Sequence, residues 1–112
     1  MDGDGEEIRE GRKRSGHHQW MDFAVAEARA GLFEGGIPVG AVLVEDGRIL
    51  GRGHNRRVQQ GNPVLHAEID CLQDAGRRGN FRNSVLYSTL MPCYLCAGAA
   101  VQFGIPVVVA GE

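Results

Sequence analysis

Two short strings, His66-Ala67-Glu68 and Pro92-Cys93-Tyr94-Leu95-Cys96, contain residue types that bind metal ions and transfer protons. Cys93 and Cys96 are three positions apart, so on a helix both sulfur atoms can reach one ion. Zinc accepts cysteine sulfur and histidine nitrogen in tetrahedral geometry, and His66 would supply the third ligand. Three protein ligands leave a fourth position open for water, which is typical of a catalytic zinc site rather than a structural one.

Glu68 lies two positions after His66, about 200° away around a regular helix. Both side chains can approach one centre only if the end of the helix points at that centre. Asn62-Pro63 predicts the start of this helix, because Asn caps helices and Pro is tolerated at the first helical position. Near that end, Glu68 would take a proton from the water and pass it to the substrate, while the metal lowers the pKa of the water.

Two other interpretations of these residues stay open. Cys93 and Cys96 could form a redox pair, although the His-x-Glu string would then have no role. The metal could instead be structural, which would require a fourth ligand. The candidates for that ligand are His54, Cys71, His17 and His18.

Length and composition narrow the class of protein. The chain has 112 residues, enough for one domain, and is 43% hydrophobic and 23% charged, as soluble domains are. Its net charge of −2 argues against a general nucleic-acid binder. No apolar stretch approaches the ~18 residues of a membrane span, and the N-terminus has no apolar signal-peptide core. The three cysteines are therefore expected to stay reduced, in a cytoplasmic protein.

The chain divides into a charged N-terminal segment and a patterned remainder. Residues 1–18 carry nine charged groups and predict a disordered tail, so the folded domain is expected over residues 19–112. A helix is predicted to begin at Trp20 and to end at Gly35-Gly36. Its apolar face comprises Met21, Ala24, Val25, Ala28 and Leu32. Trp20 and Phe23 are expected to anchor this helix in the core.

Beyond this helix the pattern alternates strands and helices. Strands are predicted over 39–44, 48–53, 85–90 and 107–110, with a hairpin turn at Glu45-Asp46-Gly47. Further helices are predicted to begin at Asn62 and at Pro92. The first of these would direct Ile69, Leu72 and Ala75 to the core, where Cys71 would also fill space. Three helices with a four-stranded mixed sheet predict a layered α/β fold.

Together with three further strings, the two motifs resemble the cytidine deaminase-like superfamily, and within it small cytosine deaminases of the fungal and bacterial type. The resemblance runs from about Met21 to Glu112 and implies a three-layer α/β/α fold. It also implies one zinc ion per chain, held by His66, Cys93 and Cys96, with Glu68 as the proton shuttle. The further strings are Glu34-Gly-Gly-Ile-Pro-Val-Gly40, Gly51-Arg-Gly-His-Asn-Arg56 and Gly104-Ile-Pro106.

The resemblance further implies an activity and a set of substrate contacts. The activity is hydrolytic deamination of a nucleobase, cytosine to uracil and ammonia, as in pyrimidine salvage, by a homodimer. Asn55 would hydrogen-bond the base through its side-chain amide, although a turn role after a strand also suits this residue. The backbone of Ala67 would face the base, and Ile37 would line the pocket.

The resemblance leaves open which substrate the enzyme takes and whether the chain has activity. Fungal-type cytosine deaminases usually have Gly at position 67, whereas nucleoside and tRNA deaminases commonly have the Ala found here. A deaminase of tRNA adenosine, or of another base or nucleoside, is therefore the alternative enzyme. The family continues with a further helix, a fifth strand and a C-terminal helix. The chain is thus expected to be C-terminally shortened, with the edge of its fourth strand bare, and a zinc-binding domain without activity is the third alternative.

Overall fold

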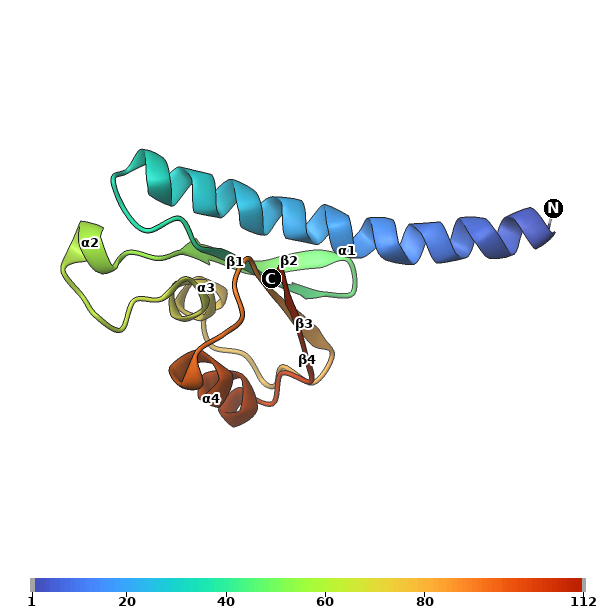
Figure 1. Cartoon of the computed structure of the whole chain (residues 1–112). Helices are drawn as coiled ribbons and strands as arrows, with labels where there is room; N and C mark the ends of the chain where they lie inside the picture. The colour runs from blue at the N-terminus through green and yellow to red at the C-terminus, as the bar shows by residue number, and fades with distance from the viewer. Residues whose placement is uncertain (1, 112) are drawn as a thin grey trace.

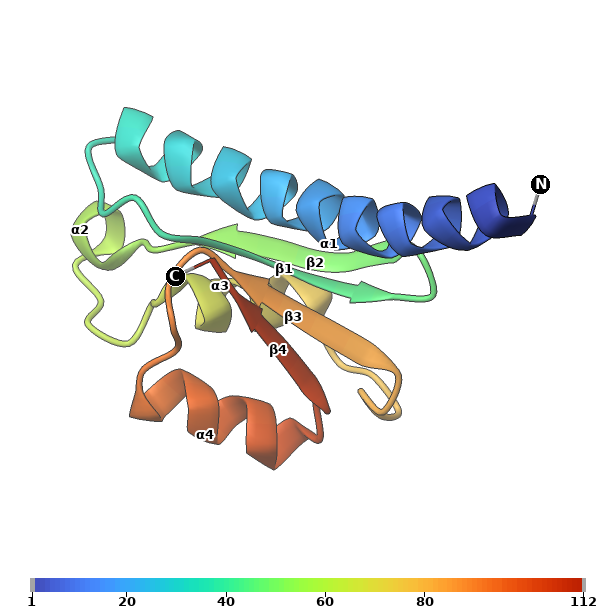
Figure 2. The same cartoon turned by 45° about the vertical axis from the view of Figure 1, so that its right-hand side comes forward.

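The computed structural model describes the backbone of residues 2–111 and the side chains of residues 16–111. A four-stranded sheet lies between helix α1 on one face and helices α3 and α4 on the other (Figures 1 and 2). This arrangement confirms the predicted three-layer α/β/α architecture. In chain order the elements are α1 (Asp2–Phe33), β1 (Gly40–Glu45), β2 (Arg48–His54), α2 (Arg57–Gln60), α3 (Ala67–Ala75), β3 (Ser84–Ser88), α4 (Tyr94–Phe103) and β4 (Val107–Ala110).

The sheet is mixed and has the strand order β2-β1-β3-β4. β1 pairs antiparallel with β2 and with β3, and β3 pairs parallel with β4 through the connection that contains α4. A parallel pair requires such a crossover, whereas the antiparallel β1–β2 pair needs only a tight turn. That turn is Asp46-Gly47, where both residues have positive φ, 51° and 74°. Two positive φ values match the twist of a two-residue hairpin, as the Asp-Gly sequence predicted.

Each face of the sheet buries its own apolar cluster. The cluster under α1 contains Ala24, Val42, Val44 and Tyr87, with Trp20 and Phe23 packed against it as predicted. The cluster under α3 and α4 contains Ala41, Leu43, Ala67, Cys71, Leu86, Ala100 and Ile105. Full burial of a side chain such as Leu43 or Leu86 stabilises the fold by about 2 kcal/mol. The predicted core role of Cys71 is confirmed, because this residue is fully buried.

Three glycines bring helices into direct contact with the sheet. A Cβ on Gly40 would lie 2.0 Å from the carbonyl oxygen of Ala24 in α1. Cβ atoms on Gly51 and Gly53 would lie 2.5–2.6 Å from backbone atoms of Cys71 in α3. The backbone of α3 therefore rests on the backbone of β2, with no side chain between them at these points.

The first helix differs from the prediction at both ends. It does not begin at Trp20 but already includes His17, whose Nδ1 lies 2.6 Å from the Tyr87 hydroxyl oxygen in β3. Near the C-terminal end, Leu32 is 58% exposed, although the pattern placed it on the buried face. The disordered tail was predicted over residues 1–18, and the side chains of residues 1–15 lie outside the described residues, so the tail stays a prediction.

The second predicted helix begins later than expected. Asn62 does not cap a helix; its Oδ1 accepts a hydrogen bond from the Val64 nitrogen (3.1 Å), which is a local turn typical of Asn before Pro. Helix α3 begins at Ala67, with His66 as its N-cap residue. The short helix α2 was expected to be a polar loop. Among the described residues, no helix combines the length and apolarity needed to cross a membrane.

Candidate functional site

His66, Cys93 and Cys96 lie together between the N-terminal ends of α3 and α4. One potential ligand atom from each lies within 4.8 Å of the other two, and His66 Nδ1 is 3.5 Å from Cys93 Sγ. These are the three residues that the sequence analysis singled out as metal ligands. Segments 27 residues apart along the chain therefore contribute to one cluster.

Helix capping explains how these side chains come to face one another. His66 is the N-cap residue of α3 and Cys93 that of α4, and both have extended backbone angles. Neither side chain caps its helix by a hydrogen bond. Both are therefore free to point away from the helix axis, toward the cluster. Cys96 follows in the first turn of α4, where the positive end of the helix dipole favours a thiolate.

The donor set and its spacing fit a zinc ion. Zinc binds His nitrogen at about 2.0 Å and Cys sulfur at about 2.3 Å with tetrahedral angles, so a bound nitrogen and sulfur should be about 3.5 Å apart. The 3.5 Å between His66 Nδ1 and Cys93 Sγ agrees with this separation. Burial, followed by the negative charge of Glu68, raises the pKa of the Cys96 thiol. A cation at this position would offset both effects.

The four candidates for a fourth protein ligand lie outside the cluster. Cys71 Sγ donates to the carbonyl oxygen of Gly51 at 3.4 Å, in the core between α3 and β2. The His54 ring lies between Glu27 of α1 and Glu34, the residue directly after α1. Among the residues that the structure describes, the only cluster with metal-ligand spacing is the one with three members. This leaves the fourth position open, as in catalytic zinc sites.

Glu68 is buried beside this cluster. It is 4% exposed and occupies the second position of α3, two residues after the N-cap His66. The helix end is therefore closer to Glu68 than the predicted start at Asn62 implied. Ser88 Oγ, at the end of β3, donates a hydrogen bond to Glu68 Oε2 at 3.4 Å. A carboxylate held in such a place can accept a proton and release it again.

Asn55 follows β2 and is almost fully buried. Its backbone nitrogen donates to the carbonyl oxygen of Val39, and its Oδ1 accepts a hydrogen bond from the Arg57 nitrogen, both at 3.0 Å. The amide oxygen thus serves the turn that leads into α2. Because Oδ1 is engaged there, the Nδ2 group is the part of the side chain with donors to offer a ligand.

The other two predicted substrate contacts lie on neighbouring segments. Ala67 is fully buried, and the first hydrogen bond of α3 runs from Asp70 N to His66 O. The Ala67 N–H therefore has no acceptor within its own helix. Ile37 is half-buried and lines a pocket of about 280 Å³ with Arg57, Val58, Gly61 and Pro63.

The sequence analysis did not anticipate the network around His54. His54 Nδ1 lies 2.8 Å from Glu27 Oε1, and Nε2 lies 2.9 Å from Glu34 Oε1. Burial raises the pKa of Glu27, but hydrogen bonds from His54 and Arg52 outweigh it and hold this pKa below its usual value. The hydrogen bond from His54 likewise lowers the pKa of Glu34. The sequence carries no local signal for this network, because Glu27 and Glu34 lie 27 and 20 residues before His54.

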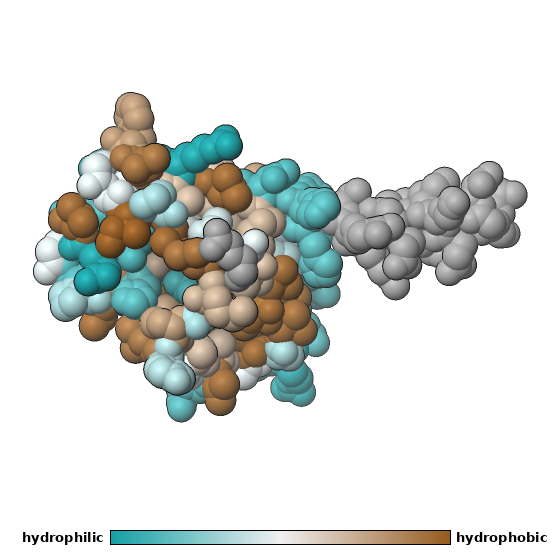
Figure 3. All heavy atoms as spheres, in the orientation of Figure 1, coloured by the Kyte–Doolittle hydropathy of each residue, from teal (hydrophilic) through white to brown (hydrophobic). Residues whose placement is uncertain are grey.

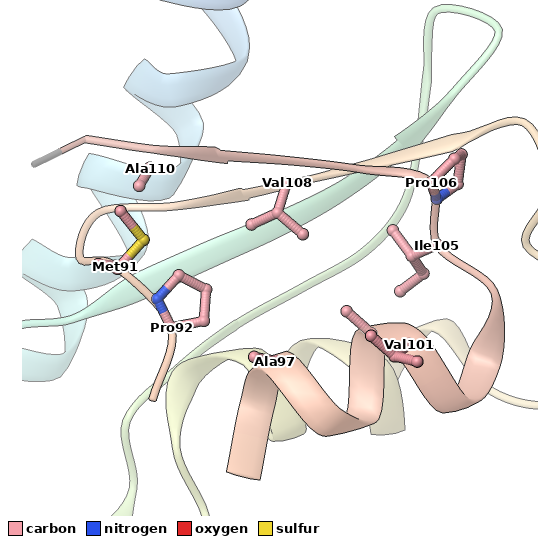
Figure 4. A pocket seen from close by; sticks show the side chains of 9 residues that line it. Met91, Pro92, Ala97, Val101, Ile105, Pro106, Val108 and Ala110 are labelled. Atoms are coloured by element: carbon pink, nitrogen blue, oxygen red, sulfur yellow. The ribbon is translucent and has the colours of Figure 1, made fainter. Parts of the chain in front are cut away.

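An apolar groove of about 600 Å³ lies between α4 and β4 (Figure 4). Its lining includes Met91, Pro92, Val101, Ile105 and Val108. β4 is an edge strand, with Val107 45% and Val108 38% exposed, and hydrophobic side chains gather over this part of the surface (Figure 3). The edge of the fourth strand is thus bare, as expected from the sequence.

The chain matches a known family over most of its length. The model of the cytidine and deoxycytidylate deaminase zinc-binding region matches residues 14–112. A cytosine deaminase of Candida albicans is 38% identical over 95 residues, 82% of this chain and 63% of that protein. A tRNA-specific adenosine deaminase of Streptococcus pyogenes is 39% identical over 95 residues, 82% of this chain and 60% of that protein. The chain therefore spans about 60% of the length of these relatives.

Solved structures agree with the fold. The guanine deaminase of Bacillus subtilis superimposes with a TM-score of 0.79 at 31% identity, covering 84% of this chain and 62% of that one. A chain from a study of tRNA:A34 deaminases, which edit A to I at the wobble position of transfer RNA, gives a TM-score of 0.77 at 33% identity. That match covers 83% of this chain and 74% of the other.

Proposed function

Because the chain belongs to the cytidine and deoxycytidylate deaminase zinc-binding family, we propose that it is a zinc-dependent hydrolytic deaminase of a nucleobase, with cytosine as the first candidate substrate. The observation that carries this proposal is the buried Glu68 carboxylate beside the three-residue cluster of His66, Cys93 and Cys96. The ion, when bound by these residues, supplies a Lewis acid that makes water nucleophilic near neutral pH.

Glu68 moves the protons of this reaction. Its carboxylate accepts a proton from the attacking water and delivers it to the ring nitrogen of the base, and then assists departure of the amine as ammonia. The hydrogen bond from Ser88 Oγ to Oε2 supports one orientation of the carboxylate. For cytosine, the C–N bond to the exocyclic amine breaks and a C–O bond forms, so that cytosine and water give uracil and ammonia.

Asn55 and Ala67 hold the base against this carboxylate. The Nδ2 group of Asn55 donates a hydrogen bond to an acceptor on the base, such as the carbonyl oxygen of cytosine, since its Oδ1 is engaged by Arg57 N. The Ala67 N–H, free at the start of α3, supplies a second donor. Ile37 lines a pocket with Arg57 and Pro63 whose lining includes none of Asn55, Ala67 and Glu68, so its contact with the base stays a prediction.

A tRNA adenosine deaminase is the second candidate. The relative from Streptococcus pyogenes with this name is 39% identical over as many residues as the cytosine deaminase, and Ala67 is the residue that tRNA deaminases commonly have. The homodimer expected from the resemblance and the cytoplasmic location expected from composition also stay predictions.

Ammonia release by the zinc-loaded 112-residue chain tests the proposal. The substrates offered are cytosine, other bases, nucleosides and tRNA, with Glu68→Gln as the control. General acid–base catalysis contributes about 10²- to 10⁴-fold, so this variant should lose at least 100-fold in turnover while its zinc content stays unchanged. Release from tRNA that weakens steeply with salt would favour the second candidate. Full turnover in the variant would exclude the role given to Glu68.

A further inference from the structure

The histidine next to Asn55 has a carboxylate oxygen against each of its ring nitrogens. The side chain of His54 is 5% exposed, with Glu27 of α1 on one side and Glu34, the residue directly after α1, on the other. Nδ1 lies 2.8 Å from Glu27 Oε1 and Nε2 lies 2.9 Å from Glu34 Oε1, so each ring nitrogen has its own carboxylate partner. We propose that His54 is a positioning residue, whose hydrogen bonds to Glu27 and Glu34 fix the backbone from which Asn55 presents its amide to the base.

The same stretch of backbone is fixed from the opposite side by α3. The His54 backbone nitrogen donates to Asp70 Oδ2 at 3.0 Å, and Arg56 Nε donates to the same oxygen at 2.9 Å. The Arg56 backbone nitrogen also donates to the carbonyl oxygen of Leu65 at 2.9 Å, just before the metal cluster. Both neighbours of Asn55 are therefore tied to the helix that carries Glu68. His54 extends this frame to α1.

Acidic and basic side chains alternate in the network around His54. Three carboxylates, one from α1, one from the turn after α1 and one from α3, face two guanidinium groups and the imidazole ring: Glu27, Glu34, Asp70, Arg52, Arg56 and His54. The geometry thus favours a side chain with two opposed nitrogen atoms at position 54, which histidine provides.

This inference rests on the proposed contact between Asn55 and the base, but it makes no use of the metal. His54 lies 12 positions before His66 in the chain, and its ring contacts Glu27 and Glu34 rather than α3. A change at position 54 should therefore weaken binding of the base and leave zinc content unchanged. Because the amide contact exists before and during the reaction, the change should raise KM more than it lowers kcat.

The test compares two half-replacements of the ring in the zinc-loaded, ¹⁵N-labelled full chain. His54→Gln keeps a donor near Glu34, and His54→Asn keeps one near Glu27. The matched control is Arg29→Gln, which removes a charge from the exposed face of α1, the helix that carries Glu27. Each is made in the Glu68→Gln chain, so that bound cytosine is not consumed. The readouts are the side-chain amide signals of Asn55 and the dissociation constant of cytosine.

We expect both His54 variants to shift the Asn55 amide signals and to weaken cytosine binding about tenfold, the effect of misplacing one hydrogen bond. The control should match the parent in both readouts, and zinc content should be equal in all chains. Unchanged Asn55 signals, or an unchanged affinity for cytosine, in folded His54 variants would overturn the proposal.

Failure of the proposed function gives a different result. If the parent chain binds neither cytosine nor another base, that function is wrong, and the Asn55 signals alone then decide the role of His54. If both His54 variants fail to fold, Glu34→Gln replaces them, because it neutralises a carboxylate that is 41% exposed and keeps the ring. It should shift the same Asn55 signals by a smaller amount. Signals identical to those of the parent would overturn the proposal.

Discussion

The metal cluster and the segment His54-Asn55-Arg56, which we call the base-binding corner after its proposed role, are built by different means, although α3 contributes to both. At the metal cluster, backbone geometry directs the side chains, since His66 and Cys93 are N-cap residues that make no capping hydrogen bond. At the base-binding corner, Asn55 lies between His54, which contacts Glu27 of α1, and Arg56, which forms an ion pair with Asp70 of α3. Loss of the ion should therefore disrupt the metal cluster, whereas loss of a charged side chain should disrupt the base-binding corner. The two should be separable by mutation.

Removing a metal ligand should have the largest effect. We expect Cys93→Ala to lower zinc content from about one ion per chain to near zero. A ligand present at a thousandfold excess over its Kd stabilises a protein by about 4 kcal/mol, and this contribution should disappear. Metal analysis and thermal unfolding with and without zinc measure both effects.

The third cysteine offers the matched control for that experiment. Cys71→Ala removes a buried sulfur outside the cluster, so it should keep its zinc and lose only about 1 kcal/mol from the core. Equal zinc content in the Cys93→Ala and native chains would contradict the assignment of Cys93.

Moving α3 away from β2 should disturb the metal cluster and the base-binding corner together. The Cβ of Gly53→Ala would lie 2.5 Å from the Cys71 backbone nitrogen and 2.7 Å from Asp70 Oδ2, so the helix must move. We expect a loss of about 3 kcal/mol in the free energy of unfolding, measured in urea. Gly98→Ala, an exposed helix position with open space around its Cβ, should instead gain up to about 1 kcal/mol. A Gly53→Ala chain as stable as the native one would show that this contact is not tight.

Acid should weaken the base-binding corner through Glu27. Because the pKa of Glu27 is lowered on folding from 4.5, its stabilising effect is complete above about pH 4.5 and is lost as the pH falls through the lower, folded value. Glu27→Gln should cost about 2 kcal/mol near neutral pH and should flatten the decline of Tm at acid pH.

Thermal unfolding between pH 3 and 6 measures this difference. Zinc release at acid pH affects the native and variant chains alike, so the difference between them isolates Glu27. The control is Asp22→Asn, an exposed acidic residue on the same helix, which should follow the native curve. Parallel curves for the native and Glu27→Gln chains would exclude the pH effect.

The order of the elements was predictable because their signals are local. Apolar periodicity and the Asp46-Gly47 turn act within a few residues, and the helices and strands they predicted are present. Boundaries were less predictable where two local signals compete. Asn62-Pro63 suits a helix start and a turn equally, and the structure forms the turn, so α3 begins at Ala67.

The residues of the metal cluster were easier to predict from the sequence than those of the base-binding corner. The metal cluster was visible because zinc ligands are few in type and strict in spacing, so His66, Cys93 and Cys96 could be grouped without coordinates. The partners of His54 could not be grouped in this way, since they lie 20 and 27 residues away, in and directly after α1, and belong to common residue types. Their pairing depends on how α1 lies across the sheet. The close approach of α1 at Gly40 sets that placement.

The glycines of β2 have a consequence for how this protein could be re-engineered. Where two elements meet through side chains, a larger or smaller core residue changes their separation, and a catalytic distance drifts with it. Between α3 and β2 the backbones are in direct contact. The distance from Glu68 on α3 to Asn55 after β2 therefore does not depend on the size of a side chain packed between them. Side chains in the cluster under α1 can therefore be replaced by larger or smaller ones with little change in the distance between the Glu68 carboxylate and the Asn55 amide.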